Sequence, residues 1–99
     1  MMELTGKYLR LELSSAAMGN FFGKDPKPGP RWDLIGEVRG ETSGIGLWFH
    51  LIALGVDGVD PTWQPEARAV YLIRWEWILN ATIFHEKPKN LEKIGFRPV

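Results

Sequence analysis

The sequence predicts a small all-β protein, folded as a barrel. Segment 69–84 contains no Gly or Pro, and apolar side chains occupy almost every second position in it. Residues on a strand alternate between its faces, so this period indicates extended chain. Other alternating stretches are separated by turns that contain Gly, Pro or Asp, as in small barrels. Apolar residues make up 44% of the 99 residues, with five tryptophans, which supports one packed domain over 1–99.

The first strand is expected over 7–13, because Leu9, Leu11 and Leu13 fall on one face of it. The stretch 14–31 that follows has no strand rhythm, and it is longer than most connections in compact domains. We therefore expect a long loop inserted after the first strand, with its proline-rich second half in an extended path.

Segments 32–41 and 45–56 are expected to form the second and third strands. The short turn between them contains Gly44, and two alternating runs joined by such a turn predict a hairpin. Segment 57–66 carries an Asp-Gly and an Asp-Pro pair, which favour a loop.

Segment 69–84 is expected to form one long strand, or a strand that bends into two. The residues of its apolar face are Tyr71, Ile73, Trp75, Trp77, Leu79, Ala81 and Ile83. The opposite face is not cleanly polar, because it carries Val70, Leu72, Ile78 and Phe84. A segment with apolar residues on both faces is rarely an outer strand facing water, so we expect another subunit to cover part of it.

Residues 85–99 are expected to form a C-terminal extension. Asn90 is a candidate cap for one helical turn over 91–94, and Gly95 is expected to end that turn.

Composition narrows the class of protein. The 12 basic and 12 acidic side chains give a formal charge of zero, so no overall attraction to nucleic acid or membrane is expected. The absence of cysteine excludes disulfides, thiolate metal sites and a cysteine nucleophile. No signal peptide pattern is present, and the apolar runs are far shorter than the about 20 residues that span a bilayer. We expect a cytoplasmic protein without membrane contact.

Catalysis has little support in the sequence. His50 lies alone in an apolar strand, and His85 lies at a strand end beside Glu86. Chemistry needs a converging set of groups, and the sequence contains no common zinc, phosphate or nucleophile motif. Asp57 and Asp60 lack the spacing of a calcium loop. We expect no enzyme activity, and no catalytic residue, metal or cofactor.

Three pieces of the chain, taken in order, resemble an Sm-like (Lsm/Hfq) protein. Residues 6–13 begin with Gly-Lys and alternate to a late Glu-Leu, as in that family's first strand. Residues 36–47, with Gly36 and Val38, resemble the first Sm motif, and 73–78, which begins Ile-Arg, resembles the second. The resemblance implies a strongly bent, open barrel of five strands, of the Sm-like or SH3-like kind. It also implies a homo-oligomeric ring in which the fourth strand of one subunit pairs with the fifth strand of the next.

The sequence departs from the family where the family contacts RNA. Thr42 stands at the usual aspartate and Gly46 at the base-contacting asparagine, while Trp75 and Glu76 replace the residues after the arginine. Only Arg74 is retained among the polar residues that contact RNA in such proteins. The resemblance therefore implies the fold more strongly than the ligand.

RNA or another single-stranded nucleic acid is the leading ligand class. Its candidate residues are Arg74, matched by the resemblance, and the cluster Lys24, Lys27, Arg31 and Trp32, which mixes basic and aromatic groups. Such a mixture suits phosphate contact and base stacking. For Arg74, an ion pair with a nearby acid or a neighbouring subunit is an equal alternative.

The candidate residues of an oligomer interface are Val70, Leu72, Trp75, Trp77 and Ile78, because large apolar side chains dominate such contacts. The alternative function is a structural or scaffolding oligomer without nucleic acid. Its partner protein would bind the proline-rich part of 14–31, since an already extended chain loses little entropy on docking.

Overall fold

The computed structural model describes residues 3–14, 32–55 and 69–99, and for Trp32 its backbone alone. The expected loop at 14–31, except Ser14, and the loop at 57–66 lie outside these ranges. The strands are β1 (Tyr8–Leu13), β2 (Trp32–Thr42), β3 (Gly46–Gly55), β4 (Val70–Arg74), β5 (Ile78–Phe84) and β6 (Phe96–Pro98), and the two 3-10 turns are η1 (Trp75–Trp77) and η2 (Leu91–Ile94). The predicted all-β class is confirmed. No helix in the described ranges is long and apolar enough to cross a bilayer.

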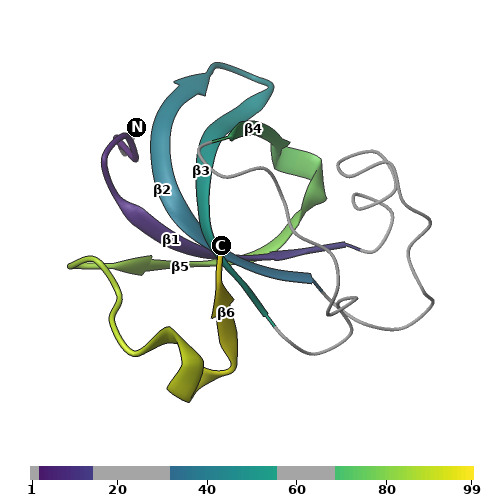
Figure 1. Ribbon diagram of the computed structural model, residues 1–99. Coiled ribbons are helices and arrows are strands. Elements are labelled where there is room, and N and C mark those ends of the chain that lie inside the picture. The colour runs from purple at the N-terminus through teal and green to yellow at the C-terminus, as the bar shows by residue number, and fades with distance from the viewer. Residues whose placement is uncertain (1–2, 15–31, 56–68) are drawn as a thin grey trace.

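The six strands of the described residues all belong to one open antiparallel sheet. Five of them lie in the order β4-β3-β2-β1-β5. β3 pairs with β2 along one edge, while β4 and β6 share its other edge, β4 at the start of the strand and β6 at its end. Figure 1 shows that β2 and β3 curve strongly, so the sheet wraps around its own core.

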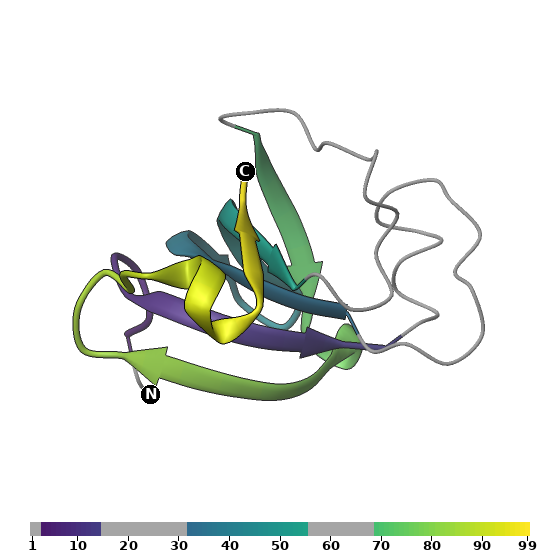
Figure 2. The same ribbon diagram turned by 60° about the horizontal axis from the view of Figure 1, so that its bottom comes forward.

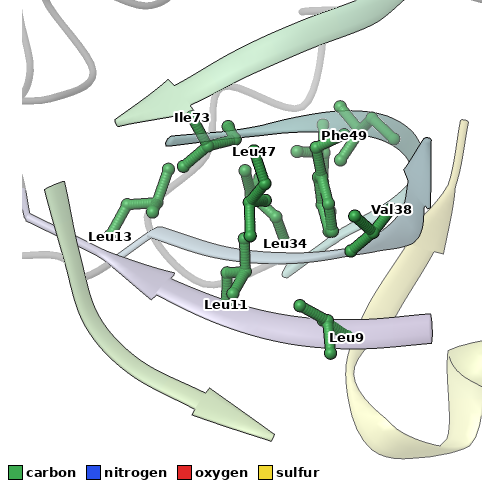
Figure 3. Packing of buried hydrophobic residues seen from close by; sticks show 10 residues of the cluster. Leu9, Leu11, Leu13, Leu34, Val38, Leu47, Phe49 and Ile73 are labelled. Carbon is green, nitrogen blue, oxygen red and sulfur yellow. The ribbon is translucent and has the colours of Figure 1, made fainter. Parts of the chain in front are cut away.

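The main core lies inside this curve. Its buried residues are Leu9, Leu11, Leu13, Leu34, Val38, Leu47, Phe49, Leu51, Leu54 and Ile73. They come from β1 to β4 at largely alternating positions, and Figure 3 shows their side chains converging between these strands. Full burial of one such side chain contributes roughly 1.5–3 kcal/mol, which explains why these strands keep this register.

The bend of β2 has a local cause at Gly36. A Cβ atom at this position would clash with the backbone carbonyl oxygen of His50 and would lie 2.7 Å from Cε2 of Phe49, so only glycine fits here without a shift of its neighbours. The pairing of β2 with β3 shifts register at this position and again before Gly40. Such irregularities bend a strand and increase its twist.

Segment 69–84 is not one continuous strand, and our expectation of an unbroken apolar face was wrong. η1 separates β4 from β5, and the backbone N–H of Ile78 donates to the carbonyl of Trp75 within this turn. On β4, Ile73 points into the core, whereas beyond the turn it is Ile78 that packs against the core. The turn and the register shift at the start of β5 interrupt the apolar face, which resumes where Ala81 and Ile83 lie opposite Leu11 and Leu9 of the core.

The C-terminal extension is part of the folded domain. Phe96 in β6 is buried with Ile35 and Ala53, on the face of the sheet opposite the main core. In Figure 2, η2 and β6 cross in front of β1. The expected turn at η2 and its end at Gly95 (φ 84°) are confirmed, but Asn90 adopts a left-handed conformation (φ 56°) and makes no capping hydrogen bond with its side chain.

Candidate functional site

The described sheet ends in two strands whose outer edges are unpaired. β4 pairs with β3 alone and β5 with β1 alone, as far as the described strands go. Figures 1 and 2 show these two strands on different sides of the curved sheet. An unpaired edge presents free backbone N–H and C=O groups to any strand that can pair with them.

β5 carries an uncovered apolar surface beside its free edge. Leu9 lies opposite Ile83 and Leu11 opposite Ala81, and opposite residues share a face of the sheet. Leu9 and Leu11 are buried in the core, whereas Ile83 is 37% exposed and Leu79 is 58% exposed. The core face of the sheet thus continues onto β5 at Ala81 and Ile83, and Leu79, at the register shift between Ile78 and Asn80, is exposed next to them. We call Leu79, Ala81 and Ile83 the edge strip.

The five predicted interface residues fall into two groups. Val70 on β4 and Trp75 on η1 are exposed, at 42% and 38%, and Leu72 is half-buried. Trp77 and Ile78 are half-buried and pack against the main core of their own chain. Sequence reasoning missed Leu79 and Ile83 as interface candidates. The alternation of apolar residues in 69–84 was visible in the sequence. It does not indicate which half of this segment is covered by the core of the same chain.

Of the five predicted RNA-binding residues, Arg74 has a described side chain. Lys24, Lys27 and Arg31 lie outside the described residues, as does the side chain of Trp32. Arg74 Nε lies 2.7 Å from Glu76 Oε1, and both side chains are about half exposed. The predicted ion pair with a nearby acid therefore forms within the chain, and it reduces the positive charge that Arg74 offers to a phosphate.

A hollow of about 650 Å³ lies at one end of the sheet, and we call it the corner hollow. It is lined by residues 3–5, by residues 41–44 around the β2–β3 turn, and by Trp75. Backbone hydrogen bonds hold these pieces together: Gly6 N donates to Val38 O at 2.7 Å, and Trp75 N donates to Ile45 O at 3.0 Å.

The corner hollow is acidic and partly aromatic. Glu3 and Glu41 line it, and no described Lys, Arg or His does. Leu4 N donates a hydrogen bond of 3.1 Å to Glu41 Oε2, which orients that carboxylate. Sequence reasoning assigned Trp75 to an interface and gave Glu3 and Glu41 no role. The sequence carries no direct signal for this grouping, because Trp75 is brought to the β2–β3 turn by the pairing of β3 with β4, which sets Gly46 beside Arg74.

Other polar groups of the described chain form small surface clusters. His50 was expected to lie alone in its strand, but it has a polar neighbour: Arg39 Nη2 lies 3.2 Å from His50 Nδ1. Arg39 Nε also pairs with Glu37 Oε1 at 2.7 Å. No group of three or more potential metal ligands occurs within the described ranges.

Comparison of the chain with protein-family models, with curated proteins and with solved structures finds no match. The function is therefore argued from the residues and their geometry.

Proposed function

We propose that this protein is an Sm-like barrel subunit that closes into a homo-oligomeric ring, with β4 of one copy paired to β5 of the next. The observation that carries the proposal is that, among the described strands, the outer edges of β4 and β5 have no partner, and that Val70 on β4 and Leu79 and Ile83 on β5 are exposed. Pairing satisfies the free backbone groups of both edges at once. Because the two edges differ, the contact is head-to-tail, and head-to-tail contacts form a ring when the rotation between copies closes and a filament when it does not.

The faces of the two strands support this arrangement. Copies in a ring are related by the same rotation, so the core face stays on one side of the extended sheet. The edge strip of an added β5 then lies beside the core face of β4, which carries Tyr71 and Ile73. Pairing would cover Leu79 and Ile83, and burying the exposed part of such side chains stabilises the assembly by about 25 cal/mol per Å² of apolar surface.

The edge strip provides the test. Leu79→Lys places a charge in the proposed interface at a position that is mostly exposed in one subunit, so the subunit itself should still fold. Asn80→Lys is the matched control, because Asn80 neighbours Leu79 and points to the opposite face, where it lies across from Glu12. Light scattering should show an oligomer for the wild type and for Asn80→Lys, and a monomer for Leu79→Lys. A monomeric wild type, or an unchanged mass for Leu79→Lys, would contradict the proposal.

Single-stranded nucleic acid is the second candidate function, as a ligand of this ring. The described residue that favours it is Arg74, whose side chain remains about half exposed at the end of β4. In a ring, each weak contact is repeated in every subunit, and repetition raises the overall affinity through effective concentration. Binding of oligouridine should weaken steeply as salt is added, and it should fall when Lys24, Lys27 and Arg31 are replaced by alanine.

A further inference from the structure

We propose that the corner hollow binds the arginine side chain of a partner polypeptide. The hollow is formed within one chain by residues 3–5, 41–44 and Trp75. The proposal therefore goes beyond ring assembly and does not depend on it.

Charge selects the class of ligand. Glu3 and Glu41 bring two carboxylates to the corner hollow, and the described lining includes no base. A phosphate there would meet negative charge, whereas a cation would be attracted. Arg74, which directly precedes Trp75, is held by Glu76 at 2.7 Å and does not line the hollow.

The side chains that line the hollow favour arginine among cations. A guanidinium is planar, stacks on aromatic faces and forms forked hydrogen bonds with a carboxylate. Trp75 is 38% exposed and offers the aromatic face. The carboxylate of Glu41 is already oriented by the hydrogen bond from Leu4 N, so less freedom is lost when it pairs with a ligand.

The volume of the hollow and the apolar residue in its lining fit a side chain that is attached to a polypeptide. Its volume of about 650 Å³ lies within the range of about 300–1,000 Å³ that is usual for ligand pockets. This space can hold an arginine and the backbone on either side of it. Leu4 lines the hollow and is half-buried, so it offers apolar contact to the methylene stem of the arginine.

The test uses a short labelled glycine-serine peptide with one central arginine, and the same peptide with citrulline, which keeps the shape but not the charge. Fluorescence anisotropy with the full chain at low salt should show the arginine peptide binding about tenfold more tightly than the citrulline peptide. Glu41→Gln should remove most of this difference, because its amide oxygen can still accept from Leu4 N while the charge is lost. Glu92→Gln, which changes an exposed acid on η2, should leave it intact.

Equal binding of the two peptides would overturn the proposal, as would an equal loss in Glu41→Gln and Glu92→Gln. Oligouridine that displaces the arginine peptide and binds Glu41→Gln more tightly than the wild type would also overturn it, and would assign the hollow to RNA. The outcome is separate from that of ring assembly. A monomer that discriminates between the peptides contradicts the ring alone, and an oligomer that does not discriminate contradicts the arginine site alone.

Discussion

The guanidinium of Arg10 lies over the ring of Phe96, with 5.3 Å between Cζ and the ring centroid. The same guanidinium donates a hydrogen bond of 3.4 Å from Nη2 to Asp33 Oδ2. One cation thus joins β1, β2 and β6 on the face of the sheet opposite the main core. A cation held over an aromatic ring contributes about 0.5–1 kcal/mol at exposed sites, in addition to the burial of the ring itself.

Removal of the Phe96 ring should destabilise the whole domain. Phe96 is 2% exposed, and Phe→Ala at a buried site lowers the free energy of unfolding by about 3–5 kcal/mol. Urea unfolding of Phe96→Ala, followed by circular dichroism, measures this loss. Ile94→Ala is the control in the same segment, because Ile94 is 54% exposed, and it should change stability by about 0.5 kcal/mol or less. Equal, small effects of both variants would show that the extension is not docked on the sheet.

Two glycines of β2 should respond differently to alanine. A Cβ at Gly36 would clash with the backbone carbonyl oxygen of His50 and meet the ring of Phe49 at 2.7 Å, whereas a Cβ at Gly40 would lie 3.9 Å from Trp48 Cδ1. We expect Gly36→Ala to lower the free energy of unfolding by about 1–3 kcal/mol through overpacking, and Gly40→Ala to be nearly neutral. Thermal unfolding of both variants measures the difference. If Gly36→Ala is as stable as Gly40→Ala, β2 does not cross Phe49 in the described way.

The ion pair of Arg74 with Glu76 predicts how charge controls RNA binding. Glu76→Gln should raise the affinity for oligouridine about two- to fivefold, since an exposed ion pair is worth roughly 0.2–1 kcal/mol. Arg74→Ala should lower the affinity by at least as much. Anisotropy titrations at low salt measure both effects, with Glu86→Gln as an exposed control. An absence of binding by the wild type at low salt would remove RNA as a ligand.

The sequence predicted those parts of the fold in which side chains alternate regularly along a whole strand. β1 and β3 follow from their alternation, and the turn between β2 and β3 follows from Gly44, whose φ of 75° suits glycine. η1 could not be predicted, because Trp75, Glu76 and Trp77 include no Gly or Pro. The alternation of apolar and polar residues looks the same on both sides of such a turn, so it does not reveal where the strand is interrupted.

The candidate site was predicted less completely, for a physical reason. The corner hollow joins residues 3–5, 41–44 and Trp75, and only the tertiary fold brings these distant pieces together. The edge strip was visible as apolar alternation, but its exposure depends on how far the core of the same chain extends over β5. β6 was missed because it has three residues and ends in Pro98, and proline is rare in strands outside edges.

Native mass spectrometry of the full chain at micromolar concentration tests ring closure most directly. We predict one species of more than two copies whose mass is a whole multiple of the chain mass and does not change on moderate dilution, because a closed ring has no free strand edge left to extend. A monomer, or a ladder of masses that grows with concentration, would contradict a ring closed by β4 and β5.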